Sequence, residues 1–394
     1  MSVSPRRRDQ VGTDSVRTVV YYTDAAQIGG AETVARTLLA ELDDRFEVTI
    51  VGSDASVVDH IAAVRPSANT VLVPPITDRR DVAAMVKLRR VLRALRPDIF
   101  HANLSEGSSC QYGLLVALSI PGLRVVATEN SPMGVRSGLS RRIKRFSAPR
   151  FDAHIGVGRR AAALVEADVG LASGAVEVIP NAVPVVEHRS PAHRAPAGSD
   201  SPVRIVAISR FDPVKGLDVL FDAVALLDRG SLSPFEVVVI GDGPQRGELE
   251  AHIDRLGIRD LVTLVGWVDD ARQELVDFDL FVLPSRLEGL PMSLLEAMHA
   301  GVAVVATDVG SVREVLDSDA VGVVVAPGDA PALAEAIGAL IDDGQRRRGL
   351  AAAGQARALE QYTSAVNVAA YAAVYDRVAA EPTHRLRGRP NARG

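Results

Sequence analysis

Residues 280–299 read LFVLPSRLEGLPMSLLEAMH, which is an apolar run, a short loop and then a helical pattern. The run Leu280–Pro284 predicts a buried strand, and Pro291 suits the first turn of the helix that follows. The backbone N–H groups from Gly289 to Ser293 would then be donors without partners at the positive end of that helix. Such a helix start is a ready site for an anion such as phosphate.

The same alternation of β-branched runs and longer helical patterns, such as Ala31–Leu42 and Gly216–Leu227, recurs along the chain. Near-continuous apolar strands separated by helices predict parallel sheets that are covered on both faces. The expected strands are Thr18–Tyr22, Glu47–Val51, Ile99–His101, Arg124–Thr128, Ala153–Val157, Arg204–Ser209, Phe235–Ile240, Val262–Val265, Leu280–Pro284, Ala303–Thr307 and Gly322–Val325.

A break in this pattern at residues 184–202 reads PVVEHRSPAHRAPAGSDSP and is interpreted as an interdomain linker. It separates two expected doubly wound α/β domains, 17–183 and 203–360, that face each other across a cleft. Ligands of such sheets bind outside the carboxyl ends of the strands. A helix at 361–380 is expected to cross back to the first domain. The ends of the chain, 1–16 and 381–394, are expected to be basic, disordered tails.

Composition narrows the class of protein. The 394 residues are 47% apolar, which suits two buried cores, and a net charge of −5 argues against a general nucleic-acid binder. A single cysteine, Cys110, and the lack of a signal-peptide or membrane-spanning pattern predict a cytoplasmic protein.

Basic residues crowd the stretch VRSGLSRRIKRF at Val135–Phe146. This stretch is either a solvated surface helix or a contact with an anionic membrane at the inner face of the plasma membrane, or with a phosphorylated acceptor.

Two carboxylates and two cations carry the predicted chemistry. Glu288 precedes the helix start described above and Glu296 lies one turn inside the helix. Carboxylates repel phosphate, so their placement makes sense if they accept hydrogen bonds from the hydroxyls of a sugar and a ribose; the alternative is a surface loop and a helix cap. Arg210 and Lys215 in SRFDPVKG follow another strand and suit a diphosphate.

Together these features resemble retaining glycosyltransferases of the GT-B fold, and specifically glycosyltransferase family 4 (glycosyl transferases group 1), over about residues 17–378. The resemblance rests on the E-x7-E signature from Glu288 to Glu296, on Arg210 with Lys215, on Ile179-Pro180-Asn181-Ala182 in place of IPNG, and on the loop Gly29-Gly30-Ala31-Glu32. It implies two Rossmann-like domains that face each other across the cleft, with the acceptor bound by residues 17–183 and the nucleotide sugar bound by residues 203–360.

The resemblance also implies the site residues. Arg210 and Lys215 neutralise the diphosphate of the donor, Glu288 holds hydroxyls of the transferred sugar, and Glu296 binds the ribose. Catalysis is assigned to Arg210, Lys215 and Glu288. Substrate binding is assigned to Gly29, Gly30, His101, Asn130, Asn181, Gly241, Gly266, Trp267, Gly289, Leu290, Pro291, Ser293 and Glu296.

One position departs from the family pattern. Asn130 stands where a histidine is often found near the sugar, and an amide cannot carry a proton at neutral pH. This departure leaves the sugar preference open. His101, at the expected end of a neighbouring strand, is a second candidate on the cleft side, although a lone histidine is more often structural.

The implied reaction is a front-face transfer of a hexosyl unit from a UDP- or GDP-sugar. The anomeric configuration is retained, and no cofactor or metal is expected. Two Asp-x-Asp pairs, Asp277 with Asp279 and Asp317 with Asp319, are interpreted as structural. The expected acceptor is a glycan, glycolipid or lipid-linked saccharide of cell-envelope or polysaccharide synthesis. The alternatives are a nucleotide-sugar epimerase of similar architecture and a non-catalytic protein that binds sugar nucleotides.

Overall fold

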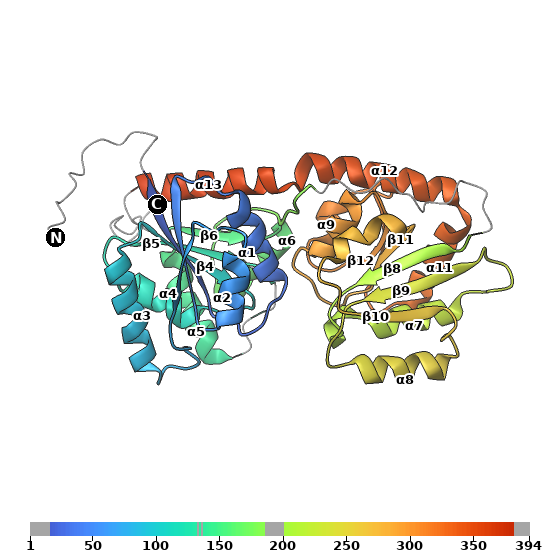
Figure 1. Cartoon of the computed structure of the whole chain (residues 1–394), viewed down its shortest axis with the longest axis horizontal. Helices are drawn as coiled ribbons and strands as arrows, with labels where there is room; N and C mark the ends of the chain where they lie inside the picture. The colour runs from blue at the N-terminus through green and yellow to red at the C-terminus, as the bar shows by residue number, and fades with distance from the viewer. Residues whose placement is uncertain (1–15, 132–133, 135–136, 186–200, 382–394) are drawn as a thin grey trace.

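The computed structural model describes residues 16–131, 134, 137–185 and 201–381. They form two α/β domains that lie side by side, with the last two helices of the chain running along one edge of both (Figure 1). Most of the expected tails and most of the expected linker lie outside the described residues. No described helix is long and apolar enough to cross a membrane.

The first domain is built on a seven-stranded parallel sheet in the order β3-β2-β1-β4-β5-β6-β7. Its strands are β1 (Arg17–Thr23), β2 (Phe46–Gly52), β3 (Asn69–Leu72), β4 (Ile99–Leu104), β5 (Arg124–Glu129), β6 (Ala153–Gly156) and β7 (Glu177–Val178). Its helices are α1 (Gly30–Glu41), α2 (Ala55–Ala62), α3 (Val82–Leu95), α4 (Gln111–Leu118), α5 (Gly138–Ser147), the 3-10 turn η1 (Ala148–Arg150) and α6 (Arg159–Val169).

The second domain is built on a six-stranded parallel sheet in the order β10-β9-β8-β11-β12-β13. Its strands are β8 (Val203–Ile208), β9 (Phe235–Ile240), β10 (Val262–Gly266), β11 (Leu280–Leu283), β12 (Ala303–Thr307) and β13 (Val323–Val325). Its helices and 3-10 turns are η2 (Pro213–Lys215), α7 (Leu217–Leu226), α8 (Arg246–Leu256), η3 (Ala271–Gln273), η4 (Leu275–Asp277), α9 (Met292–His299), α10 (Val312–Val315), α11 (Ala330–Asp342) and α12 (Gly344–Gln361).

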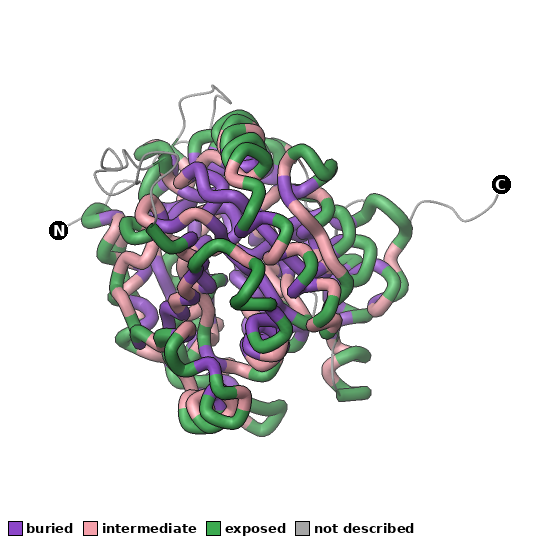
Figure 2. Tube along the Cα trace, turned by 90° about the vertical axis from the view of Figure 1, so that its right-hand side faces the viewer, coloured by how far each residue is buried: buried purple, intermediate pink, exposed green. Residues whose placement is uncertain are grey.

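The strand sequences explain why both sheets are covered on both faces. Successive side chains of a strand point to opposite faces. In β1, Val19 and Tyr21 enter one hydrophobic core while Val20 and Tyr22 enter another. All four side chains are nearly inaccessible. Figure 2 shows buried segments in the interior of the molecule and exposed ones around its outside. The prediction of two doubly wound parallel sheets is therefore confirmed.

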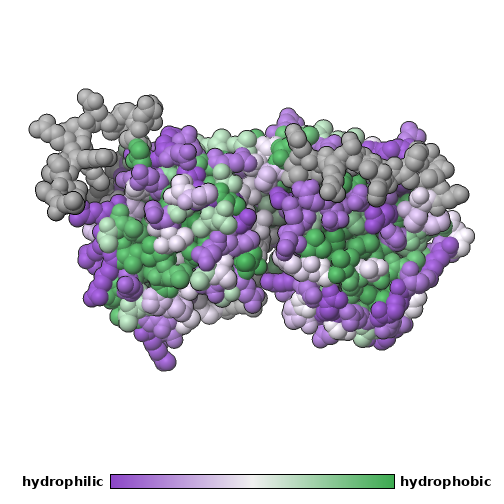
Figure 3. Space-filling model, viewed as in Figure 1, coloured by the Kyte–Doolittle hydropathy of each residue, from purple (hydrophilic) through white to green (hydrophobic). Residues whose placement is uncertain are grey.

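The last helix, α13 (Ser364–Ala380), lies on the first domain although the chain has just left the second. Its side chains Val368, Tyr371 and Tyr375 belong to the core that α1 and β1 share. The two crossings between domains meet where Val183 pairs with Thr363 in an isolated β-bridge. A space-filling view shows a furrow between the two domains on the side away from these crossings (Figure 3).

Candidate functional site

The candidate site lies where the strand order of the second sheet reverses. β8 and β11 are neighbours there, although the strands β9 and β10 lie between them in sequence. In open α/β sheets this switch point is where ligands bind, beside the carboxyl ends of the strands. Arg210 and Lys215 follow β8, and Glu288 follows β11. The fold thus brings the predicted cations and the first predicted carboxylate to one edge.

Lys215 and Glu288 are in direct contact. The Lys215 Nζ donates to Glu288 Oε1 at 2.8 Å, and the Ser285 hydroxyl donates to the same oxygen at 2.7 Å. The side chain of Glu288 is 9% exposed and that of Lys215 is 25% exposed. Arg210 is more open and pairs with Asp212 at 2.8 Å. A half-buried ammonium group therefore faces the loop that leads into α9.

Gly216 sets the distance between the two loops. Its φ is +65°, and a Cβ there would come within 2.2 Å of the Pro284 carbonyl oxygen. Only glycine combines that backbone conformation with so close an approach. The 3-10 turn that carries Lys215 can for this reason lie against the end of β11.

Helix α9 begins one residue later than the sequence predicts. Met292 is its first residue, and Pro291 is the N-cap with extended backbone. The N–H groups of the first turn have no acceptor within the helix. Ser293 is half-buried in this turn. Leu290 is buried, and its carbonyl accepts a hydrogen bond from Asn181 Nδ2 at 2.9 Å, across the domain boundary.

Glu296 lies one turn into α9 and is half-buried. Burial raises the pKa of its carboxyl to about 7, against the opposing effect of the Arg272 guanidinium. Arg272 is itself held by Asp270 at 2.7 Å. Arg272 was not predicted from sequence, because it lies in a short 3-10 turn without any motif.

Because of the raised pKa of Glu296, we expect the free energy of unfolding to depend on pH. A carboxyl whose pKa is raised by folding stabilises the folded state below its unfolded pKa, and that contribution is lost as the pH rises through about 7. Glu296→Gln cannot ionise, so its free energy of unfolding should exceed that of the wild type by on the order of 2 kcal/mol at pH 8. The difference should shrink as the pH falls below about 7 and vanish below about pH 4, where the carboxyl is protonated in both the folded and the unfolded state. Urea titrations across this range measure it, and a difference that does not change with pH would contradict the prediction.

The first domain contributes the opposite wall. The backbone carbonyl oxygen of Asn130 lies so near Gly289 that a Cβ on Gly289 would come within 2.4 Å of it. The Asn130 amide nitrogen donates to Asn103 Oδ1 at 2.8 Å, while its Oδ1 is buried without a partner among the described residues. Asn130 therefore meets the second domain at the loop that carries Glu288.

The glycine loop lies at the end of β1 in the same domain. Gly29 is the N-cap of α1, and its N–H donates to the Glu32 carboxylate at 3.0 Å. A side chain on Gly30 would meet nothing within 4 Å, so the space beside it is open. Burial raises the pKa of Glu32, whose second carboxylate oxygen has no partner among the described residues.

The expectation that His101 faces the cleft is wrong. β4 continues three residues beyond it to Leu104, so His101 lies inside the strand and is fully buried. Its Nε2 bonds to the Thr128 hydroxyl at 2.8 Å and its Nδ1 to the Tyr375 hydroxyl at 2.5 Å. Burial lowers the pKa of its imidazole to about 3. His101 is a core residue that helps to seat α13.

The remaining predicted contacts surround β10. Gly241 and Gly266 have φ values of +135° and +97°, and the Gly241 N–H donates to the Gly266 carbonyl at 2.8 Å. A Cβ on Gly241 would come within 1.9 Å of the Ser209 carbonyl oxygen. Trp267 is 69% exposed and donates from its indole nitrogen to Asp269 at 3.1 Å. These glycines bring the ends of β8, β9 and β10 together, with an open indole beside them.

The Asp-x-Asp pairs lie elsewhere. Asp277 and Asp279 stand at the amino end of β11, away from Glu288, and the Asp279 carboxylate accepts from the Arg204 N–H at 3.0 Å. Asp317 pairs with Arg357 at 2.8 Å. Within the described part of the chain, no group of three or more His, Cys, Asp or Glu residues could hold a metal ion.

Part of the basic stretch forms α5, and its lysine is not on the surface. Lys144 is 8% exposed and donates to Glu129 Oε1 at 2.7 Å and to the Gly107 carbonyl at 3.0 Å. His154 Nε2 bonds to the same Glu129 oxygen at 2.9 Å. Although burial alone raises the pKa of Glu129, the Lys144 ammonium and the His154 hydrogen bond outweigh it and lower the pKa below its usual range. Val135 and Arg136 lie outside the described residues.

The two domains also meet at Glu314, a contact that no sequence motif predicted. The Glu314 carboxylate of the second domain accepts from the backbone N–H groups of Arg159 and Arg160, both at 2.8 Å. These groups form the amino end of α6 in the first domain, where negative charge is favoured. The acceptor and the donors lie 155 and 154 residues apart in the chain.

Comparison with known proteins gives two family matches. The model described as Glycosyltransferase Family 4 matches residues 28–187, and the model described as Glycosyl transferases group 1 matches residues 190–357. Between them the matches include every predicted site residue.

Curated relatives match shorter parts of this chain. An exopolysaccharide phosphotransferase of Streptomyces coelicolor is 30% identical over 267 residues, which are 67% of this chain and 27% of that protein. The lipopolysaccharide core biosynthesis mannosyltransferase LpsB of Rhizobium meliloti is 34% identical over 172 residues, 41% of this chain and 48% of that protein. The alpha-D-kanosaminyltransferase of Streptomyces kanamyceticus is 34% identical over 39% of each chain. The alignments thus span between about a quarter and a half of these relatives.

Solved structures match nearly the whole chain. Anabaena Alr3699/HepE in complex with UDP-glucose has a TM-score of 0.75 at 20% identity, over 92% of this chain and 100% of that one. A glycosyltransferase from Rickettsia africae has a TM-score of 0.77 at 14% identity, over 93% and 99%. At such identities these likenesses establish the fold alone, and they confirm the expected GT-B arrangement.

Proposed function

Because this chain belongs to glycosyltransferase family 4 (glycosyl transferases group 1), we propose that it transfers a hexosyl unit from a UDP- or GDP-sugar to an acceptor, with retention of configuration. The proposed acceptor is a glycan, glycolipid or lipid-linked saccharide. Relatives named for polysaccharide or lipopolysaccharide synthesis support this acceptor class.

The proposal rests on one observation. Lys215 Nζ contacts Glu288 Oε1 at 2.8 Å, beside the start of α9. When a diphosphate leaves, negative charge grows on its oxygens. A fixed ammonium group and the N–H groups of a helix start stabilise that growing charge more than they stabilise the ground state. In this proposal the Lys215 ammonium donates hydrogen bonds to the diphosphate when the donor is bound, and Glu288 accepts hydrogen bonds from sugar hydroxyls.

Retention then needs no covalent intermediate on the protein. Glu288 is already engaged by Lys215 and by the Ser285 hydroxyl, which lowers its value as a nucleophile. The acceptor attacks the anomeric carbon on the face from which the diphosphate departs, and a donor phosphate oxygen takes the acceptor proton. The protein positions the two substrates and stabilises the negative charge of the departing diphosphate. Glu296 binds the ribose.

A membrane contact at the cytoplasmic face is the proposed location. On α5, Arg141, Arg142 and Arg145 are exposed beside the exposed apolar side chains of Leu139 and Phe146. Cations next to apolar groups suit an anionic lipid surface. This arrangement supports an acceptor that is attached to lipid.

A nucleotide-binding panel tests the donor half of the proposal. We expect UDP or GDP, and their sugars, to raise the melting temperature, because a ligand at about 100 times its Kd adds about 2.7 kcal/mol to the free energy of unfolding. ATP and inorganic phosphate serve as controls. The shift should persist in excess chelator, whereas strict dependence on a divalent metal would contradict the proposed charge neutralisation by Arg210 and Lys215.

Incubation with the donor alone separates transfer from the rival activity. An epimerase converts the donor without any acceptor, whereas a transferase needs one for rapid turnover. Rapid formation of an epimer, followed by NMR of the sugar protons, would replace our proposal. Binding without any turnover across a broad acceptor panel would favour a non-catalytic protein.

A further inference from the structure

Helix α6 of the first domain is capped by a side chain of the second domain. Its N-cap is Gly158, which has no side chain to accept the N–H groups of the first turn. Glu314 accepts them instead, with Oε2 on the Arg159 N–H and Oε1 on the Arg160 N–H, each at 2.8 Å. Figure 1 shows α6 at the boundary between the two domains. A helix of one domain is thus completed by the other.

The two backbones approach closely at this contact. A Cβ on Gly158 would lie 1.9 Å from Ser311 Oγ and 2.5 Å from Ser311 Cβ. The residue before it, Val157, is fully buried and belongs to a hydrophobic core that is made mainly by the second domain. Apolar packing and two hydrogen bonds to a charged acceptor, which are stronger than neutral ones, therefore meet at the amino end of α6.

The backbone of Glu314 is held by its own domain. Arg357 Nη2 and the Tyr362 hydroxyl, at the end of α12, donate to the Glu314 carbonyl at 3.0 and 3.3 Å. The Glu314 N–H donates to the Ser311 carbonyl at 3.0 Å. The carboxylate that caps α6 therefore extends from a fixed backbone.

The same short segment holds the loop that carries Glu288. The Ser311 N–H donates to the Gly289 carbonyl at 2.8 Å. Gly310 has a φ of +50°, and a Cβ there would come within 2.3 Å of the carbonyl oxygens of Glu288 and Gly289. Residues 310–314 therefore connect the cap of α6 to the loop of Glu288.

The first domain touches this loop from the other side. A Cβ on Gly289 would come within 2.4 Å of the Asn130 carbonyl oxygen and 3.4 Å of Val157 Cγ2. The loop of Glu288 thus lies between the first domain and residues 310–314, which are themselves joined to the first domain through α6. A change in the angle between the domains would move all of these contacts together.

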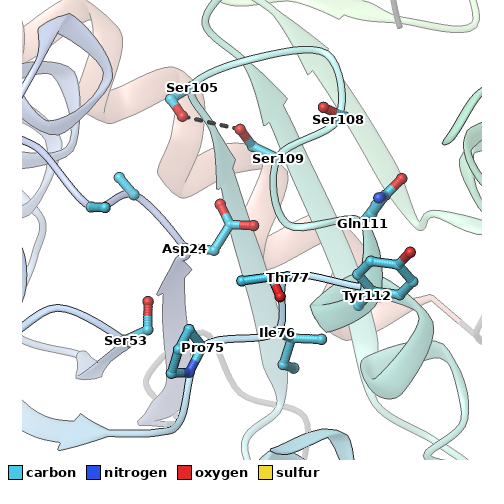
Figure 4. A pocket seen from close by; sticks show the side chains of 12 residues that line it. Asp24, Ser53, Pro75, Ile76, Thr77, Ser105, Ser108, Ser109, Gln111 and Tyr112 are labelled. Carbon is cyan, nitrogen blue, oxygen red and sulfur yellow. Dashed lines mark hydrogen bonds between the residues drawn. The ribbon is translucent and has the colours of Figure 1, made fainter. Parts of the chain in front are cut away.

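Groups of the two domains can act together only if this angle is constant. The first domain has a polar cavity of about 360 Å³ beside the carboxyl ends of β1 and β4, with Asp24, Ser105 and Tyr112 on its wall (Figure 4). Lys215 and Glu288 belong to the second domain, so their distance from this wall depends on the angle. A displacement of about 1 Å between reacting groups can lower a rate by about a hundredfold.

We propose that Glu314 is a positioning residue, which fixes the angle between the two domains and, through Gly310 and Ser311, the place of Glu288 relative to the first domain. The inference rests on the proposed transferase function and adds a residue that acts on turnover from outside the donor site. Because the Glu314 carboxylate faces α6, nucleotide affinity should not depend on it.

Pulsed electron paramagnetic resonance of two spin labels measures the angle. Ala94→Cys on α3 and Ala251→Cys on α8 place the labels at exposed helix positions of the two domains, and the native Cys110 is buried. Glu314→Gln keeps the shape of the side chain but offers one oxygen to two N–H donors. We expect a distance distribution about twice as wide, because domains joined by few contacts move relative to each other. Glu335→Gln, at an exposed position of α11, is the matched control and should leave the width unchanged.

Kinetics and calorimetry on Glu314→Gln separate positioning from loss of fold. The kcat for release of the nucleoside diphosphate from the preferred donor should fall about tenfold to a hundredfold. The affinity for UDP or GDP, whichever stabilises the protein in the binding panel, should stay at the wild-type value. Partial unfolding would lower kcat and the number of binding sites in proportion, so full binding stoichiometry with a reduced kcat is the signature of a positioning role.

Arg159→Pro tests the same contact from the first domain. Proline is favoured at the first position of a helix, and the extended backbone of Gly158 suits a following proline, so α6 should remain intact. The N–H that donates to Glu314 Oε2 is nevertheless lost. This variant should reproduce the wider distribution and the lower kcat. The double variant should be no worse than the weaker single variant, because both changes remove one contact.

Three results would overturn the inference. These are an unchanged width of the distance distribution in Glu314→Gln and Arg159→Pro, losses in kcat that add fully in the double variant, and a loss of nucleotide affinity in Glu314→Gln as large as its loss in kcat. A wild-type protein that neither binds nucleotide nor transfers sugar would instead refute the proposed function. In that case the distance distributions alone would still decide whether Glu314 fixes the angle between the domains.

Discussion

Lys215→Met is expected to lower kcat by roughly 10² to 10³, the cost of removing one fixed group that stabilises developing charge. Lys215 Nζ lies 2.8 Å from Glu288 Oε1 beside the start of α9, where the departing diphosphate is proposed to sit. Methionine keeps the length and the apolar stem but removes the charge. Release of the nucleoside diphosphate from the preferred donor measures the effect.

The split between kcat and KM distinguishes catalysis from simple binding. If Lys215 acts mainly on the departing diphosphate, kcat should fall much more than KM for the donor rises. Lys87→Met, which removes an exposed lysine of α3, is the matched control and should keep wild-type turnover. Wild-type kcat in Lys215→Met would show that the cation is not part of the reaction.

Lys144→Met is expected to destabilise the protein by about 3–5 kcal/mol, the usual cost of leaving a buried charge without its partner. Glu129 is 1% exposed, and Lys144 Nζ, at 2.7 Å, is the main source of the positive charge that keeps it ionised. Without that ammonium group, Glu129 must either be buried as an anion or take up a proton. Urea unfolding at pH 7.5 gives the change in the free energy of unfolding.

The same cluster predicts a pH dependence of definite sign. The pKa of Glu129 is lowered by folding, so its contribution to stability is present above the unfolded pKa and is lost as the pH falls through the folded one. The deficit of Lys144→Met should therefore shrink in acid, below about pH 4.5. Arg141 lies on α5, as Lys144 does, and forms a partly exposed ion pair with Asp168 of α6. Arg141→Met, which removes that pair, should cost at most about 1 kcal/mol. Equal losses in the two variants would contradict the prediction.

The sequence predicted all six strands of the second sheet and the central strands of the first sheet, but it missed both edge strands of the first sheet. β8, β9 and β11 are runs of apolar residues because both faces of each are covered. β3 (Asn69–Leu72) and β7 (Glu177–Val178) were not predicted. Both are short, largely open strands, so their residues carry no apolar run. Apolar runs such as those of β10 and β13 reveal even an edge strand, whereas a short edge strand made of exposed residues leaves no pattern in the sequence.

In the candidate site, motifs located the loops but not the contacts made there. Lys215 and Glu288 were singled out separately, and only the fold shows that residues 73 apart share a hydrogen bond. His101 was misplaced because β4 runs on to Leu104, a length that the sequence DIFHAN leaves open. Glu314 and the cluster of Glu129, Lys144 and His154 had no signal, because their partners come from other strands and helices.

The position of α13 has a consequence for the order in which the chain is completed. Residues 364–380 close a core that otherwise consists of the first domain, through Tyr371, Tyr375 and the buried His101. Domains generally fold as units while they are being synthesised. Here α1 and α2 cover part of that face of the sheet, but the part that α13 covers stays open until all of the second domain has been synthesised. The half made first is thus finished last, and this exposed apolar patch must be protected from aggregation during that interval.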